Sequence, residues 1–514
     1  MNPRYRYIFL LLFVTACSFL ASSLWANDDL PSPKREFRGA WLHVIGQNQW
    51  MNKSPQQQQE YIREQLDRLQ EAGCNAVIFQ VRPTADALYK SEIEPWSAWL
   101  TGKRGKAPAE DWDPLEYVIE ESHKRGLELH AWLNPYRVTS SAKDILPSNH
   151  LSNQEPHRFV KFNGQTFFDP AYEENRQYIA DIVADIVRRY DVDAIHFDDY
   201  FYPYPSGSAK FDGDSKSYAE MGNGKDKGDW RRENVDKLIE LVSYTIKDIK
   251  PWVRFGISPF GIWRNKSNDP RGSESSGLQN YDDLYADVLL WAEKGWIDYL
   301  APQLYWSLDL KVAPTRKLAK WWNDNTPESC DLYIGYDVQR TMDNATADDR
   351  NELATKVNLS RSLPNVKGNI WWHGYWVTGN YKGALDALAQ RHQRSLALAP
   401  AYGNDEKRPE KVKNLRADII DDVKVIAWDY PDNFAGYDSK SSSSEEKAAD
   451  PVKFVVYEFF EGEEINLDDP QAIIAVTPLN AIRMDSAEPG TVFIVTALDR
   501  MNRESDPSAR LIIK

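Results

Sequence analysis

Residues 191–205 read DVDAIHFDDYFYPYP, a short apolar run that ends in two adjacent acids among aromatic residues. Side chains of a β-strand alternate between two faces, so Ile195 and Phe197 share one face while His196 and Asp198 share the other. Burying an ionised carboxylate is costly unless a partner pairs with it. The stretch therefore predicts a buried strand whose end carries either a neutralised acid or a reactive one.

Seven further apolar runs of this kind lie along the chain, and amphipathic helical segments such as QQQQEYIREQLDRLQEAG separate them. The runs are FRGAWLHV, NAVIFQVRP, LELHAWLNPYR, VRFGISPFG, DYLAPQLYW, LYIGYD and NIWWHGYW. Eight strands that alternate with helices predict an α/β fold, a closed (β/α)8 TIM barrel over residues 34–400. The active site of such a barrel lies at the C-terminal ends of its strands.

The last part of the chain has a different pattern. Short strand-like runs such as VKVIAWDYP, VKFVVYEFF and TVFIVTALDR follow one another without helical segments between them. This pattern predicts an all-β sandwich of the immunoglobulin-like or fibronectin type III kind over residues 408–514. Residues 436–450, GYDSKSSSSEEKAAD, are polar and low in complexity, which predicts a surface loop between two strands.

The N-terminus, residues 1–26, has the form of a secretory signal, with a positive start followed by an apolar run too short to span a bilayer. VTAC at residues 14–17 fits a lipobox with Cys17 as the lipidated residue, and cleavage after Ala26 is the alternative. We therefore expect an exported protein of the outer membrane, periplasm or cell surface, with this lipid as its only membrane anchor. We expect Cys74 and Cys330 to be buried free thiols rather than a disulfide.

The composition excludes some partners and favours others. A net charge of -15 argues against nucleic acid or an anionic membrane, which are bound through clustered Lys and Arg. The 19 Trp residues favour a ligand with flat apolar faces, such as a sugar. His43, His130 and His373 lie on separate strands and show no HxH or HxxxH spacing, so we expect no metal site and no cofactor.

Polar side chains converge on the predicted barrel axis when the alternation is applied to every strand. Purely structural barrels fill the axis with Val, Ile and Leu, so this concentration predicts a substrate site. Asp198 is the predicted nucleophile or electrostatic stabiliser, and Asp199 is the first candidate for its partner acid, ahead of Asp86 and Asp337. The predicted substrate-binding residues are Gln80, Arg82, Asp86, Trp132, Asn134, Tyr136, His196, Tyr200, Gln303, Tyr305, Trp306 and His373.

Alternatives to this reading of the acids stay open at this stage. An ion pair between Asp198 and Arg82 would only close the top of the barrel. A catalytically inactive barrel would use the aromatic cleft to bind carbohydrate for adhesion or sensing. A second carboxylate about 5 to 10 Å from Asp198 would favour a hydrolase. A polysaccharide deacetylase would need a metal site, for which the His and Asp spacing gives little support.

The motifs EFRGAWLHV, VIFQVRPTADALYKSEIEPWSAWLTG, HAWLNPYR and DAIHFDDYFYPYP, in this order, resemble the glycosyl hydrolase-like family 10 domain. The resemblance covers the whole barrel and implies a bacterial envelope glycosidase, with peptidoglycan glycan strands stripped of their peptides as the substrate. Broader superfamilies of barrel glycosidases also place a catalytic Asp at the end of the fourth strand, and this position falls on Asp198. Chitinase-like barrels have a Glu where this sequence has Tyr200, so their substrate-assisted mechanism is not carried over.

Overall fold

The computed structural model describes residues 30–148, 150–345, 350–403, 408–420, 423–430, 451–484 and 487–514. The predicted signal with Cys17 and the predicted polar loop at residues 436–450 lie outside these ranges. Within them, no helix has the length and apolar character needed to cross a membrane. The barrel and the β-strands that follow it belong to one compact unit, Ser32–Lys514.

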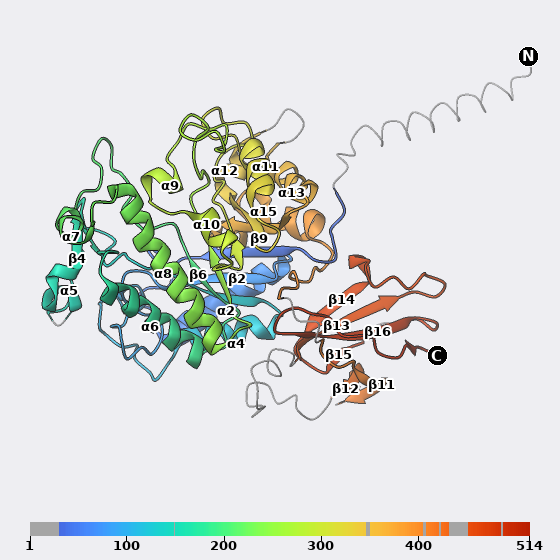
Figure 1. The fold of residues 1–514 in the computed structure, drawn as a ribbon. Helices are drawn as coiled ribbons and strands as arrows, with labels where there is room; N and C mark the ends of the chain where they lie inside the picture. Colours follow the sequence, from blue (N-terminus) through green and yellow to red (C-terminus); the bar gives the residue numbers. More distant parts are fainter. Residues whose placement is uncertain are drawn as a thin grey trace, which may run out of the picture. The chain divides into compact units, whose positions relative to one another are not determined.

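Eight parallel strands form a closed barrel in the order β1-β10-β9-β8-β7-β6-β3-β2 (Figure 1). The strands are β1 (Phe37–Leu42), β2 (Ala76–Arg82), β3 (Glu128–Leu133), β6 (Ala194–Phe197), β7 (Arg254–Ile257), β8 (Tyr299–Leu300), β9 (Asp331–Asp337) and β10 (Val366–Trp372). Phe37 lies beside Gly368 where β1 pairs with β10 and closes the ring. Each strand overlaps one of the eight predicted runs, although β9 and β10 begin one and three residues before theirs, so the predicted (β/α)8 barrel is confirmed.

Helices surround the strands. The longer ones are α2 (Pro55–Glu71), α4 (Pro114–Lys124), α6 (Glu173–Arg189), α8 (Lys227–Ile249), α11 (Thr315–Asn325) and α13 (Leu353–Ser362). The shorter ones are α3 (Ala98–Thr101), α5 (Leu151–Gln154), α7 (Ser215–Met221), α9 (Asn280–Asp283), α10 (Val288–Glu293), α12 (Val338–Asp343), α14 (Gly374–Thr378) and α15 (Ala384–Ala387). Ser54 and Gln57 form a capping box that starts α2, and the carboxylate of Asp113 caps α4.

The strand side chains divide between two cores. Residues of one parity, such as Val77, Phe79 and Ile195, pack outward against the helices. Residues of the other parity fill the barrel interior, and they include Trp41, Ile78, Trp132, Ala194, Tyr299, Tyr333 and Ile370. This division follows from the two-residue period of a strand, and it aims the polar residues of the second parity along the barrel axis.

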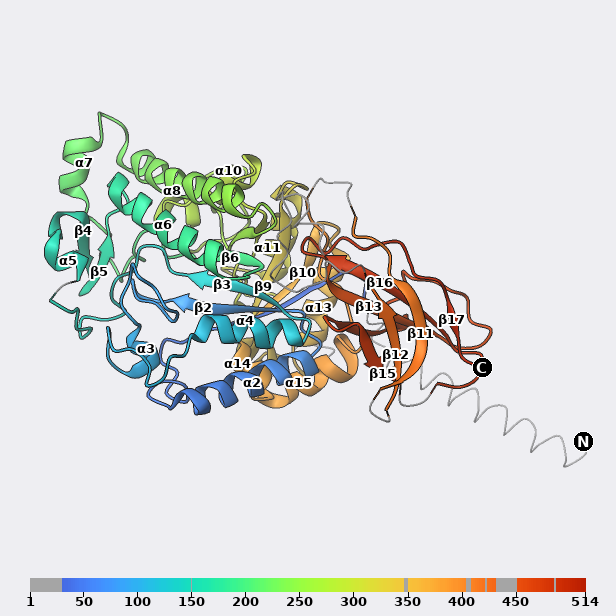
Figure 2. The same cartoon turned by 90° about the horizontal axis from the view of Figure 1, so that it is seen from below.

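Two antiparallel sheets follow the barrel (Figure 2). One contains β11 (Lys413–Ile420), β12 (Val423–Asp429) and β15 (Ala481–Arg483), and the other contains β14 (Ile473–Thr477), β13 (Pro451–Phe459), β16 (Val492–Asp499) and β17 (Leu511–Ile512). Trp428, Phe454 and Val495 belong to a buried apolar core that draws on strands of both sheets. The predicted β domain after the barrel is therefore confirmed. Cys74 and Cys330 are buried free thiols, as expected.

A small hairpin interrupts the barrel between β3 and α6. It pairs β4 (Phe159–Phe162) with β5 (Gln165–Phe168). Asn163 and Gly164 form its turn with φ of 50° and 77°. Two successive residues with positive φ are the requirement of a type I′ turn, which Asn-Gly meets at little strain. The insertion lies after the C-terminal end of β3, the end at which a barrel carries its site.

Candidate active site

A cavity of about 370 Å³ lies at the C-terminal ends of the barrel strands. The strands and the loops that follow them supply its walls, so residues distant in the sequence meet there. The lining residues are Trp41, His43, Ile45, Gln80, Trp132, Arg137, Asp198, Asp199, Tyr200, Tyr204, Ser258, Gln303, Tyr305 and Trp372. Both acids of the opening sequence motif therefore reach the same cavity.

Asp198 is buried and held by several donors. The indole Nε1–H of Trp132 donates to it at 3.1 Å, the amide Nδ2 of Asn134 donates at 3.1 and 3.2 Å to its two oxygens, and the backbone N–H of Tyr200 donates at 3.3 Å. Burial raises the pKa of Asp198, and the guanidinium of Arg137 together with these donors opposes that rise. The donors stabilise the ionised carboxylate.

Asp199 is also buried, but its environment favours the protonated acid. Burial raises the pKa of Asp199 to about 7, and the negative charge of neighbouring Asp198 adds to the rise. The hydroxyl of Tyr204 donates a short hydrogen bond to the carboxylate and partly offsets this effect. The site thus pairs an acid whose donors favour the ionised form with one whose pKa is raised into the neutral range.

Aromatic rings form the walls of the cavity. The rings of Tyr305 and Trp372 are nearly parallel, with centroids 6.0 Å apart and an angle of 12° between the planes. Trp41 and Trp132 meet Trp372 edge-on at 6.4 and 6.1 Å. Flat apolar surfaces of this kind suit the faces of sugar rings.

A chain of hydrogen bonds continues from the cavity into the barrel interior. The indole N–H of Trp41 donates to Nε2 of His196 at 3.2 Å, which leaves the hydrogen of this imidazole on Nδ1. His196 Nδ1–H then donates to the hydroxyl of Tyr299 at 2.9 Å, and that hydroxyl donates to Nδ1 of His130 at 2.8 Å. His130 Nε2–H donates to the carboxylate of Glu128 at 3.1 Å. Burial lowers the pKa of both imidazoles, consistent with their neutral tautomers.

The two ends of this chain connect the cavity with the C-terminal domain. At the upper end, the hydroxyl of Ser258 donates to Nε2 of His196 at 3.0 Å and lines the cavity. At the lower end, Glu128 receives hydrogen bonds from Arg254 and from Asn502, both at 2.6 Å. Asn502 belongs to the segment that follows β16, so the C-terminal domain satisfies a charge at the lower end of the barrel interior.

Nine of the predicted site residues lie at or directly beneath the cavity. Those that line it are Gln80, Trp132, Asp198, Asp199, Tyr200, Gln303 and Tyr305. Asn134 supports the Asp198 carboxylate from below, and His196 is the first imidazole of the hydrogen-bond chain. The inward parity of the strands therefore brought most of the predicted residues together.

The remaining predicted residues do not line the cavity. Arg82 pairs with Glu94 through two hydrogen bonds of 2.7 Å, so the alternative of an Arg82–Asp198 ion pair is wrong. Asp86 pairs with Arg104 at 3.1 Å. Tyr136 packs in the outer core because it follows the end of β3, where alternation no longer fixes its direction.

Two further predicted residues and one candidate acid also do not line the cavity. Trp306 packs edge-on against Phe260 at 5.3 Å. The imidazole of His373 packs against that of the lining residue His43, with the ring centroids 4.9 Å apart. Burial lowers the pKa of both imidazoles. Asp337 accepts the backbone N–H of Arg340 at 2.7 Å and thereby caps α12.

Several lining residues were absent from the predicted set. The alternation of side chains along a strand could have predicted Trp41, because this residue lies on β1. Arg137, Tyr204 and Ser258 lie beyond the ends of their strands, so the alternation does not predict the direction of their side chains. Arg137 and Tyr204 do belong to the quoted motifs HAWLNPYR and DAIHFDDYFYPYP, so the motif boundaries carried the information that alternation lacked.

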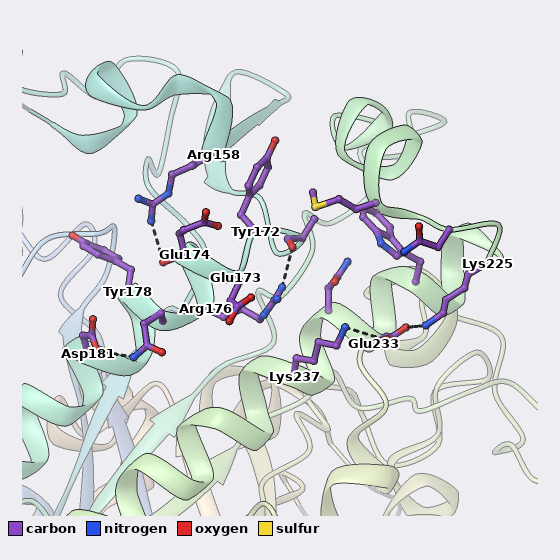
Figure 3. A pocket seen from close by; sticks show the side chains of 16 residues that line it. Arg158, Tyr172, Glu173, Glu174, Arg176, Tyr178, Asp181, Lys225, Glu233 and Lys237 are labelled. Atoms are coloured by element: carbon purple, nitrogen blue, oxygen red, sulfur yellow. Dashed lines mark hydrogen bonds and ion pairs between the residues drawn. The ribbon is translucent and has the colours of Figure 1, made fainter.

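A larger cavity of about 860 Å³ lies on the flank of the barrel between α6 and α8 (Figure 3). Its charged side chains largely engage groups of its own wall. Arg158 donates to the carbonyl of Glu174 at 3.1 Å, Arg176 donates to the carbonyl of Pro170 at 2.8 Å, and Lys237 pairs with Glu233 at 2.9 Å. Because none of its lining residues belongs to a barrel strand or to the acid pair, we place the candidate chemistry in the smaller cavity.

Two buried acids in an aromatic cavity, at the C-terminal end of a (β/α)8 barrel, are the arrangement typical of barrels of the glycoside hydrolase class. Residues 36–351 match the family model described as Glycosyl hydrolase-like 10, and the chain belongs to this family.

Proteins of known sequence support the assignment. Glycosyl hydrolase YngK of Bacillus subtilis (strain 168) is 40% identical over 415 residues, which cover 78% of this chain and 79% of the relative. Glycosyl hydrolase DigH of Escherichia coli (strain K12) is 40% identical over 362 residues, which cover 65% of this chain and 82% of the relative. Among solved structures, an endo-1,4-beta-mannanase from Rhizomucor miehei is 12% identical, with a TM-score of 0.43, and the match covers 70% of this chain and 97% of that one.

Proposed function

We propose that the protein is a glycoside hydrolase that cleaves O-glycosidic bonds of an envelope or extracellular polysaccharide, with peptide-free peptidoglycan glycan strands as the first candidate substrate. The observation that carries the proposal is the acid pair in one aromatic cavity, where hydrogen-bond donors favour the ionised form of Asp198 and the pKa of Asp199 is raised to about 7. Glycoside hydrolysis needs these two protonation states on either side of the scissile bond. Membership of the glycosyl hydrolase-like family supports the same reaction.

In the proposed reaction Asp199 donates its proton to the leaving glycosidic oxygen. Asp198 attacks the anomeric carbon or stabilises the positive charge that develops there, and the three donors to its oxygens keep it ionised and oriented. The parallel rings of Tyr305 and Trp372 offer faces on which sugar rings can stack. After departure of the leaving group, Asp199 is the base that accepts a proton from the incoming water.

The test is release of reducing ends from peptide-free peptidoglycan glycan and from a panel of other polysaccharides. We expect Asp198→Asn to bind the substrate and to lose on the order of a thousandfold in rate. Asp309→Asn is the matched control, because Asp309 has a side chain that is 76% exposed and does not line the cavity. Binding of glycan by the wild type without release of ends from any polymer would instead identify a carbohydrate-binding barrel.

We further propose that the protein is exported to the cell envelope and that a lipid on Cys17 holds it there, on the strength of the N-terminal sequence. Labelling with a radioactive fatty acid separates this proposal from cleavage after Ala26, because only the lipobox route incorporates the label, and Cys17→Ser should abolish it. We assign the C-terminal domain a fibronectin type III-like role as a spacer or docking module. Its two antiparallel sheets are consistent with that role.

A further inference from the structure

The wall of the active-site cavity contains a cationic side chain, Arg137, that acts on the charge of Asp198 without forming an ion pair with it. Its side chain is buried, with 8% of the residue exposed, and no carboxylate in the described part of the chain lies within ion-pair distance of it. Its Nε and Nη2 lie 3.4 Å from the carbonyl oxygen of Pro83, and its guanidinium covers the ring of Tyr200 at 4.5 Å. A buried cation is costly unless an anion or strong acceptor compensates it.

Other buried arginines of the barrel show what such compensation looks like in this protein. Three of them meet a carboxylate oxygen at 2.6 to 2.7 Å. The pairs are Arg82 with Glu94, Arg231 with Asp214, and Arg254 with Glu128. Arg176, which is as buried as Arg137, instead donates to two backbone carbonyls at 2.8 and 3.0 Å. The carbonyl contacts of Arg137 are longer, at 3.4 Å, and Arg137 lines the cavity.

Arg137 is also fixed in place. Its backbone N–H donates to Oδ1 of Asn134 at 3.0 Å, and the same amide holds Asp198 through Nδ2. The stacking on Tyr200 fixes the plane of the guanidinium. Asn134 therefore links Arg137 to the reactive carboxylate. An anion bound by the guanidinium would lie at a defined distance from Asp198.

We propose that Arg137 binds a carboxylate of the substrate and makes the site selective for glycans that contain an acidic sugar. The inference rests on the proposed function and refines its substrate class. A guanidinium matches a carboxylate through two parallel hydrogen bonds, which a lysine cannot reproduce. An acidic sugar would otherwise be repelled by Asp198, so the cation gives its carboxylate a favourable place. The carboxylate can belong to a lactyl ether, as in peptide-free peptidoglycan, or to a uronic acid.

The experiment compares kcat/KM for wild type, Arg137→Gln and Arg137→Lys on paired substrates. Each pair consists of a native polymer and the same polymer with its carboxyl groups reduced to alcohols. Peptide-free peptidoglycan glycan supplies the lactyl carboxylate, hyaluronan supplies a uronic acid, and chitin oligosaccharides serve as the neutral reference. We expect carboxyl reduction to cost the wild type about a hundredfold and Arg137→Gln almost nothing, with Arg137→Lys between them. The polymer that shows this difference identifies the source of the carboxylate.

Arg189→Gln is the control, because Arg189 lies on α6 with its side chain 39% exposed and outside the cavity, and it should match the wild type on every polymer. Equal rates of wild type on native and reduced polymers would overturn the inference and leave the hydrolase proposal standing. An equal loss by Arg137→Gln on acidic and neutral polymers, with a shifted acid limb of the pH profile, would overturn it by showing that Arg137 only tunes Asp198.

Cleavage of no polymer at all would count against the proposed function instead. In that case binding decides the question for Arg137. The fluorescence of the cavity tryptophans Trp41, Trp132 and Trp372 reports binding without turnover. We expect native acidic glycan to bind the wild type about a hundredfold more tightly than its reduced form, and equal binding of the two forms would overturn the inference.

Discussion

Replacing Asp199 by Asn should change the stability of the protein in a pH-dependent way. Burial and the charge of Asp198 raise the pKa of Asp199 from 3.8 to about 7, so the folded protein holds this proton more tightly than the unfolded chain. The favourable contribution is complete below about pH 4 and is lost as the pH rises through about 7. A rise of about 3 pKa units at about 1.4 kcal/mol each gives about 4 kcal/mol. Asn carries no titrating proton, so the variant escapes this loss.

Urea denaturation followed by tryptophan fluorescence at a series of pH values between about 4 and 8 measures this contribution. The free energy of unfolding of the wild type, relative to Asp199→Asn, should fall by about 4 kcal/mol over that range and level off above it. Asp309→Asn, a change at an exposed acid, should follow the wild type at every pH. Parallel curves for wild type and Asp199→Asn, with a difference that stays constant within about 1 kcal/mol, would refute the reasoning.

Further predictions concern the site and the hydrogen-bond chain beneath it. The hydrolysis rate should fall above about pH 7 as Asp199 loses its proton, and a flat profile between pH 6 and 9 would exclude Asp199 as the acid. Tyr204→Phe removes a hydrogen bond that lowers the pKa of Asp199, so the alkaline limb should move to higher pH, whereas an unchanged or lower limb would contradict that contact. Asn134→Ala should lower kcat on the order of tenfold or more and raise the pH of the acid limb, because Asp198 loses donors that favour its ionised form. Glu128→Gln should lower the free energy of unfolding by about 3 kcal/mol in urea titrations, because it removes the carboxylate nearest to buried Arg254 and leaves only Asp331 at 3.9 Å, and an unaffected midpoint would show that Asp331 suffices.

The sequence was most informative where the backbone imposes a period. Alternation along β2, β3 and β6 correctly separated the residues of the barrel interior from those of the outer core, because the two-residue period is a property of every strand. The period also placed Gln80, Trp132 and Asp198 at one end of the barrel before any contact was known.

Alternation failed where the strands become irregular or end. The pairing of β2 with β3 shifts register between Gln80 and Arg82, so the direction of Arg82 could not be extrapolated from that of Gln80. Its partner Glu94 comes from a loop, which carries no periodic signal. Tyr136 and Arg137 both follow β3, and only the three-dimensional path of the loop sends the first to the outer core and the second to the cavity.

Strand β10 gives the barrel a boundary that differs from the boundary of its family. The family match ends at residue 351, whereas β10 begins at Val366 and bonds to β1 on one side and to β9 on the other. A chain shortened to the matched residues would keep every residue of the acid pair but would leave two strand edges without partners. Such edges favour association between molecules. In this chain the family match and the closed barrel therefore end at different residues, and a fragment cut at the limits of the family match would contain the acid pair without the strand that closes the barrel around it.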